Sequence, residues 1–258
     1  MIYPILYKRA TDKKRINQWT IEVDMNRYRT ISGFQGMVQT TSEWTICEAK
    51  SYCTADEQAV KEANSLYKKK TDKGYFENIN EIDGGELFNP MLAKDWNDYK
   101  SEVKYPLYSQ PKLDGIRCIA KKDGLWSRNG KPLISAPHIF EALKPLFEIN
   151  PDLIFDGELY ADKFANDFNK ICSLVKKTKP TLQDLMESKQ SIEYHVYDLP
   201  SYNADFIYRF QYLSKLITNY NPSIVLVETN QIDNINDVTG YYEDYIDKGY
   251  EGQMLRIN

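Results

Sequence analysis

Short apolar runs alternate with amphipathic segments over residues 115–257, and this alternation restricts the fold more than any other feature of the sequence. The apolar runs are typical of strands, and the amphipathic segments repeat apolar residues at helical spacing. Because regular strand–helix–strand units are missing from the pattern, we predict an α+β domain of antiparallel sheets flanked by helices. Expected strands span 115–120, 153–160, 193–198, 223–228 and 250–257, and expected helices span 137–148, 164–177, 205–219 and 236–248.

Residues 1–80 predict a separate, small β-rich domain. Apolar and polar residues alternate from Trp19 to Met25, as in a half-buried strand. Thr54-Ala55-Asp56-Glu57 has the form of a capping box and predicts the start of a helix. Residues 76–85 lack a clear period and end in two glycines. We therefore place the boundary there and expect a second domain over residues 86–258.

Composition argues against several classes of protein. Hydrophobic residues make up 42% and charged residues 27%, as in a globular chain, and no apolar run is long enough for a leader or a membrane span. We expect a cytoplasmic protein that does not bind a membrane. Four cysteines without a CxxC pair, together with two histidines, indicate free thiols rather than a zinc site. The net charge of −4 neither indicates nor excludes a nucleic-acid partner, although seven Lys/Arg against three Asp/Glu in residues 1–30 favour a basic patch there.

Two short segments carry candidate reactive groups. Lys112-Leu113-Asp114-Gly115-Ile116-Arg117 follows an extended stretch, and its unprotonated lysine is a possible nucleophile beside a permanent cation. Asp156-Gly157-Glu158 supplies two acids at the end of an expected strand, where they can bind a sugar hydroxyl or a cation such as Mg²⁺. Taken alone, each segment is better explained as an ordinary turn.

The order of five segments gives more information than any one of them. The segments are Lys112–Arg117, Ser127-Arg128-Asn129-Gly130, Asp156-Gly157-Glu158-Leu159, Tyr197-Asp198 and Glu251-Gly252-Gln253-Met254-Leu255-Arg256. Together they resemble the covalent nucleotidyltransferase superfamily of ATP-dependent DNA ligases, RNA ligases and capping enzymes, and they look most like compact bacteriophage and viral DNA ligases. This resemblance implies an ATP-grasp-like ligase adenylation domain.

The resemblance implies a reaction as well as a fold. Lys112 attacks the α-phosphate of ATP to form lysyl-AMP, AMP passes to the 5′-phosphate of a nick, and the 3′-OH then displaces AMP. The implied cofactors are ATP and Mg²⁺, and the implied partner of a monomeric enzyme is nicked double-stranded DNA. Roles in DNA repair, replication and recombination follow from that chemistry.

The same resemblance assigns roles to residues around the nucleotide. Glu158 binds the ribose, Tyr197 stacks on adenine, and backbone near Gln110 and Leu113 meets the adenine edge. Met254 packs on the other face of the base.

Metal and DNA contacts come from the same segments. Glu251, with Glu158, holds the metal beside the nucleotide. Arg117 contacts the ribose or the 3′-OH side of the nick, and Arg128 contacts the 5′-phosphate.

Two departures leave alternatives open. The family has a Lys-x-Lys segment and an OB-fold beyond the Glu-Gly segment, whereas this sequence ends at Asn258, so we expect weak self-adenylation and poor sealing. Alternatives are an RNA ligase with the same chemistry, a GTP-using capping enzyme, and a catalytically impaired nucleic-acid-binding fragment. Residues 1–75 resemble, more loosely, the small N-terminal domain of a subset of phage ligases, with nucleic-acid or partner contact as the expected role.

Overall fold

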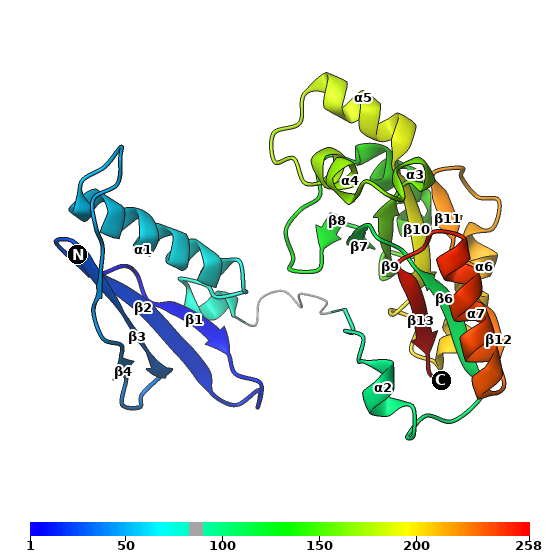
Figure 1. Cartoon of the computed structure of the whole chain (residues 1–258), viewed down its shortest axis with the longest axis horizontal. Helices are drawn as coiled ribbons and strands as arrows, with labels where there is room; N and C mark the ends of the chain where they lie inside the picture. Colours follow the sequence, from blue (N-terminus) through cyan, green and yellow to red (C-terminus); the bar gives the residue numbers. More distant parts are fainter. Residues whose placement is uncertain (83–89) are drawn as a thin grey trace. The chain divides into compact units, whose positions relative to one another are not determined.

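The computed structural model describes residues 1–82 and 90–258, and the chain divides into two compact units, Met1–Leu87 and Phe88–Asn258 (Figure 1). The glycines Gly84 and Gly85 of the expected boundary, and the expected domain start at residue 86, lie outside the described residues.

The first unit is an antiparallel sheet with one long helix, α1 (Ala55–Thr71), packed on it (Figure 1). Trp19, Ile21 and Val23 are buried on the face that contacts the helix, as their alternation predicts. The prediction that the half-buried strand extends to Met25 is wrong. Met25 lies in the turn after β2 with a φ of 50°, and its side chain is 75% exposed. The strands are β1 (Leu6–Arg9), β2 (Ile16–Asp24), β3 (Arg27–Phe34), β4 (Thr40–Thr41) and β5 (Thr45–Ile46), followed by the short helix η1 (Ile79–Glu81) after α1.

The start of α1 follows the predicted capping box. The Thr54 hydroxyl accepts a hydrogen bond from the Glu57 N–H, and the Glu57 carboxylate accepts one from the Thr54 N–H. Ala59 and Ala63 are fully buried against the sheet, so the helix approaches the strands closely.

The second unit contains two sheets. One has the order β11-β10-β9-β7-β8 and the other the order β12-β6-β13. The predicted α+β fold is confirmed, and among the described strands of this unit every pair is antiparallel except β10–β11, which is parallel. The reason is that helix α6 connects these two strands as a crossover, which returns the chain in the same direction. The strands are β6 (Leu107–Lys112), β7 (Ile116–Lys121), β8 (Gly124–Ser127), β9 (Phe155–Tyr160), β10 (Glu193–Asp198), β11 (Ile224–Leu226), β12 (Asn230–Ile232) and β13 (Gly252–Arg256).

Helices complete the second unit, and most lie where their periodicity predicts. The expected helix over 164–177 is shorter, because Asp167 accepts a hydrogen bond from the Lys170 N–H and so starts a new helix after the turn η2 (Asp162–Phe164). Phe168, the first residue of α4, is 37% exposed. The helices are α2 (Trp96–Tyr99), α3 (Pro137–Ile149), α4 (Phe168–Val175), α5 (Leu182–Ser191), α6 (Phe206–Ile217) and α7 (Ile235–Asp247).

The main core of the second unit joins the five-stranded sheet to α3, α4 and α6 through Cys118, Leu143, Phe155, Ile171 and Leu213. A smaller core, built from Leu107, Ile232 and Val238, lies between α7 and the three-stranded sheet. All four cysteines are free, as predicted. Within residues 1–82 and 90–258, no helix is both long and apolar enough to cross a bilayer.

Candidate active site

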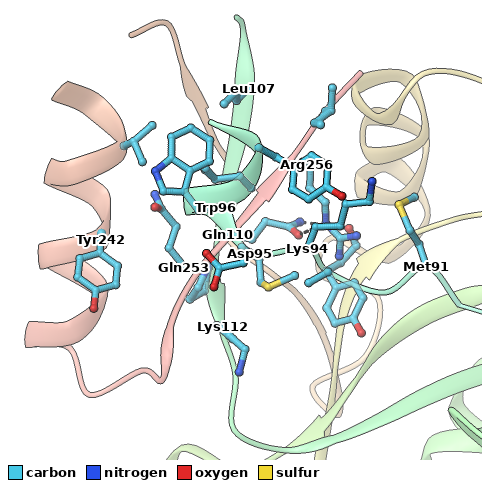
Figure 2. A pocket seen from close by; sticks show the side chains of 18 of the residues that line it. Met91, Lys94, Asp95, Trp96, Leu107, Gln110, Lys112, Tyr242, Gln253 and Arg256 are labelled. Atoms are coloured by element: carbon cyan, nitrogen blue, oxygen red, sulfur yellow. Dashed lines mark hydrogen bonds between the residues drawn. The ribbon is translucent and has the colours of Figure 1, made fainter. Parts of the chain in front are cut away.

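An open cleft of about 1560 Å³ lies in the second unit, and residues of both of its sheets line it. Strands β6 and β13, helix α7 and the segment from Met91 to Leu107 contribute to its walls (Figure 2). Every site residue predicted from the sequence lines this cleft: Gln110, Lys112, Leu113, Arg117, Arg128, Glu158, Tyr197, Glu251 and Met254.

Lys112 is the last residue of β6 and pairs with Gly252, the first residue of β13. The Glu251 N–H donates to the Lys112 carbonyl over 3.0 Å, and the Lys112 ammonium forms an ion pair with the Glu251 carboxylate. Both side chains are more than one third exposed, so a ligand in the cleft can reach them. Strand pairing therefore brings the first and last motifs of the sequence into contact.

Arg117 and Asp156 form a bidentate ion pair on neighbouring strands, with Nε–Oδ1 and Nη2–Oδ2 distances of 3.0 and 2.6 Å. Arg117 Nη1 also donates to the Met91 carbonyl over 2.7 Å. Burial by itself favours the neutral guanidine, but the hydrogen bonds and charge of Asp156 raise the pKa of Arg117 overall. Three of the five guanidinium N–H groups are therefore used within the protein, and two remain for a ligand.

Glu158 occupies the same face of β9 as Asp156, so these acids lie inside a strand rather than at its end. Burial raises the pKa of Glu158 to about 8, although the positive charges of Arg117 and Lys112 oppose this shift. A Cβ on Gly115 would lie 2.7 Å from Cγ of Glu158, so the glycine of the lysine motif makes room for this carboxyl group.

Tyr197 lies at an irregularity in the pairing of β10 with β9, between Val196 and Asp198. A bulge of this kind changes the direction of a side chain, and Tyr197 lines the cleft. The guanidinium carbons of Arg256 and Arg117 lie 4.9 and 5.9 Å from the centre of its ring. Burial raises the pKa of Tyr197 well above its ordinary value, so the phenol stays neutral.

Gln110 is almost fully buried, and its amide already has three partners. Nε2 donates to the Tyr197 carbonyl and to Thr229 Oγ1, and Oε1 accepts from Arg256 Nε over 2.9 Å. Met254 lies opposite Gln110 in the β6–β13 pairing. This network fixes the orientation of the Gln110 amide and couples it to the tyrosine of the site.

Sequence reasoning missed two contributors to the cleft. Arg256 closes the Glu-Gly-x-Met-x-Arg segment, and its position two residues after Met254 was the available signal. Met91, Lys94 and Asp95 line the cleft ahead of β6, and no pattern in that polar segment indicated a site (Figure 2).

The acids of the cleft fit a magnesium ion carried by a nucleotide. Glu251 is paired with Lys112, and Lys112 is close enough to Glu158 to oppose the rise of its pKa. Over residues 1–82 and 90–258, no three His, Cys, Asp or Glu side chains form a metal-binding group. One or two carboxylates together with phosphate oxygens are the ligands that Mg²⁺ commonly takes, so this donor set is suitable.

Comparisons with known proteins find DNA ligases that are similar to part of the chain. The DNA ligases of Enterobacteria phages T6 and T4 are each 24% identical to the chain over 64% of its length and 44% of theirs. The chain thus spans less than half of either relative. A solved structure from a study of DNA binding by Lig E DNA ligases shares the fold, with 22% identity and a TM-score of 0.51 over 67% of this chain and 62% of that one.

The family described as ATP dependent DNA ligase domain matches residues 90–257, which include both sheets, the cleft and all five motifs. The match covers well over half of the chain, and the observed α+β fold agrees with it. This chain belongs to the ATP-dependent DNA ligase domain family.

Proposed function

We propose that this chain is a DNA ligase that seals nicks through a covalent AMP intermediate on Lys112. The Lys112 Nζ lone pair forms a bond to the α-phosphorus of ATP while the bond to pyrophosphate breaks. An oxygen of the 5′-phosphate then takes AMP from the lysine, and the 3′-OH attacks that phosphate and releases AMP. The matched phage relatives are DNA ligases, which supports DNA as the substrate.

The observation that carries the proposal is the contact of Lys112 with Glu251 at the paired ends of β6 and β13. A lysine must lose a proton before it attacks phosphorus. Glu251 is the carboxylate in contact with the ammonium, and it holds Nζ at the mouth of the open cleft, where the proton can leave to water.

The residues around Lys112 supply a nucleotide site. Tyr197 presents an aromatic surface for the base, with Met254 nearby in the same cleft. Because the Gln110 amide donates both of its N–H groups internally, backbone near Gln110 and Leu113 is left to meet the base edge. Glu158 binds the ribose.

Charge on the phosphates also needs compensation. Mg²⁺ bound with ATP would be held by Glu251 and Glu158 and would neutralise charge on the phosphate oxygens. Arg128 is exposed at the cleft and fits the 5′-phosphate, whereas Arg117 has two N–H groups left for the ribose or the 3′-OH side.

A nick-sealing assay tests the proposal. The chain is incubated with ATP, Mg²⁺ and a labelled nicked duplex, and ligated product is measured for wild type, Lys112→Ala and the control Lys215→Ala on α6. We expect a low but measurable yield of product with wild type and the control, and none with Lys112→Ala. A parallel duplex with RNA at the nick distinguishes DNA from RNA ligation, and product only on the RNA-containing duplex would contradict the proposal.

A further inference from the structure

Strand β13 follows Glu251 and lies at the edge of the three-stranded sheet. Among the strands that the structure describes, it pairs with β6 alone, and Gly252 lies opposite Lys112. A shift of this pairing by two residues would keep the same side chains on each face but would move β13 along β6 by about 7 Å. The contact between Lys112 and Glu251 therefore depends on the register of one pair of strands.

Two side-chain hydrogen bonds cross this pair of strands diagonally and in opposite directions. Gln253 Nε2 donates over 2.8 Å to Ser109 Oγ, which lies two residues before the β6 residue opposite Gln253. Arg256 Nε donates over 2.9 Å to Gln110 Oε1, which lies two residues after the β6 residue opposite Arg256. Sliding β13 in either direction along β6 lengthens one of these bonds, so together they favour a single register.

The bond between Gln253 and Ser109 belongs to a polar network on the side of the sheet that faces α7, where Figure 2 shows Gln253. Ser109 is fully buried, and its hydroxyl donates to the Tyr245 hydroxyl of α7 over 3.3 Å. Asn230 of β12, which pairs with Ser109, donates to the same tyrosine oxygen over 3.4 Å. We call this group the Ser109 network: Ser109, Asn230, Tyr245 and Gln253. It joins β13 to β6, β12 and α7.

Stability alone does not account for the Ser109 network. The small apolar core of Leu107, Ile232 and Val238 already joins β6, β12 and α7. Replacing both partners of a buried hydrogen bond by apolar groups of similar shape changes stability little, so apolar side chains would hold these elements together about as firmly. Hydrogen bonds differ from apolar contacts in that they have direction and allow one alignment of the strands. The polar residues therefore add a fixed register of β13.

We propose that the Ser109 network is a positioning element for the reaction of Lys112, because it fixes β13 along β6 and so holds Glu251 against the lysine. The inference rests on the proposed function, since it concerns the reaction proposed for Lys112. The side chain of Ser109 is fully buried, so it acts through the strand and not by contact with a nucleotide. A displacement of about 1 Å in a reacting group lowers the rate by up to about 100-fold.

Two single variants remove the same bond from its two ends. Gln253→Met removes the donor at a half-buried position, and Ser109→Ala removes the acceptor while Asn230 still donates to Tyr245. Single-turnover formation of labelled lysyl-AMP is measured against ATP concentration for wild type, both variants and the double variant. We expect the maximal rate of each single variant to fall about tenfold, with the half-saturating ATP concentration within about twofold of wild type.

Coupling between the two substitutions tests whether they act through one bond. If they do, the double variant loses no more rate than the more strongly affected single variant. Hydrogen exchange at the Glu251 amide gives an independent measurement of the strand pairing, because this N–H donates to the Lys112 carbonyl. We expect this amide to exchange about tenfold faster in the two single variants and in the double variant.

Ser135→Ala is the matched control. Ser135 is also a fully buried serine of the second unit, but it lies between β8 and α3, and its hydroxyl donates to the Lys177 carbonyl. We expect this variant to keep the wild-type rate and the wild-type exchange at Glu251.

Three results would overturn the proposal: an unchanged maximal rate in Ser109→Ala and Gln253→Met, rate losses that multiply in the double variant, or an equal loss in the control. A higher half-saturating ATP concentration at an unchanged maximal rate would also overturn it, because that result indicates direct contact with ATP. Absence of lysyl-AMP from wild type would reject the proposed function itself, whereas wild-type rates in the variants would overturn this inference alone.

Discussion

Gly115 offers the sharpest prediction, because it connects two motifs of the site. An added Cβ would lie 2.6 Å from the Leu159 carbonyl oxygen and 2.7 Å from Cγ of Glu158. Ordinary contact needs about 3.5 Å, so strands β7 and β9 must separate by roughly 1 Å where Ile116 pairs with Leu159. The Gly115 backbone and the Leu159 carbonyl group cannot rotate away from each other as a side chain could. Overpacking of this kind lowers the free energy of unfolding by about 1–3 kcal/mol. For a loss of about 2 kcal/mol in a unit of this size, we expect Gly115→Ala to lower the melting temperature by about 4–8 °C.

Activity should fall together with stability, because Glu158 must move to admit the new methyl group. Thermal denaturation followed by circular dichroism measures the melting temperature, and urea denaturation measures the free energy of unfolding. Formation of labelled lysyl-AMP at a temperature where the variant stays folded measures activity. Gly240→Ala is the matched control: it lies in α7 with no neighbouring atom within 4 Å of the added Cβ, and we expect a gain of about 0.5–1 kcal/mol. If Gly115→Ala retained wild-type stability and labelling, the assigned contact between the two motifs would be refuted.

Three further predictions concern the charged groups of the cleft. Folding raises the pKa of Glu158 from 4.5 to about 8, so the free energy of unfolding should fall as pH rises between these values. Urea titrations at pH 5 and pH 8 measure this fall, and Glu158→Gln should make it smaller. An equal fall in wild type and Glu158→Gln would refute the assignment. Asp156→Ala leaves the mostly buried Arg117 without its partner, and we expect a loss of about 3 kcal/mol or more in the same titrations; a loss below 1 kcal/mol would contradict a buried pair. Arg256→Met keeps an apolar side chain against Tyr197 but removes the hydrogen bond to Gln110. By calorimetry we expect ATP binding to weaken about 3- to 10-fold, whereas equal or tighter binding would show that the arginine does not position the site.

Local sequence patterns predicted the elements of the fold well where apolar residues repeat. The capping box at Thr54 and the strand from Phe155 to Tyr160 are examples, since both depend on neighbouring residues. Helix α5 escaped prediction because its surface is largely polar, although Thr181 and Asp184 form a capping box at its start. The parallel pairing of β11 with β10 comes from the crossover helix α6 between them, and the irregular spacing of the other predicted elements hid this one strand–helix–strand unit.

Motif order identified the residues of the candidate site, but their partners required the fold. The sequence does not reveal that Arg117 donates to the Met91 carbonyl, or that Arg256 holds the Gln110 amide. Both contacts join residues from separate elements and use groups that are common on any surface. Roles for the predicted ligands of AMP, magnesium and DNA therefore remain proposals for the experiments above.

The central claim is that Lys112 carries AMP, and peptide mapping tests it most directly. The chain is incubated with ATP and Mg²⁺, digested, and analysed by mass spectrometry under conditions that preserve phosphoramidates. We predict a single AMP adduct on the peptide that contains Lys112, and its absence from Lys112→Ala. An adduct on another lysine, or labelling that persists in Lys112→Ala, would contradict the account.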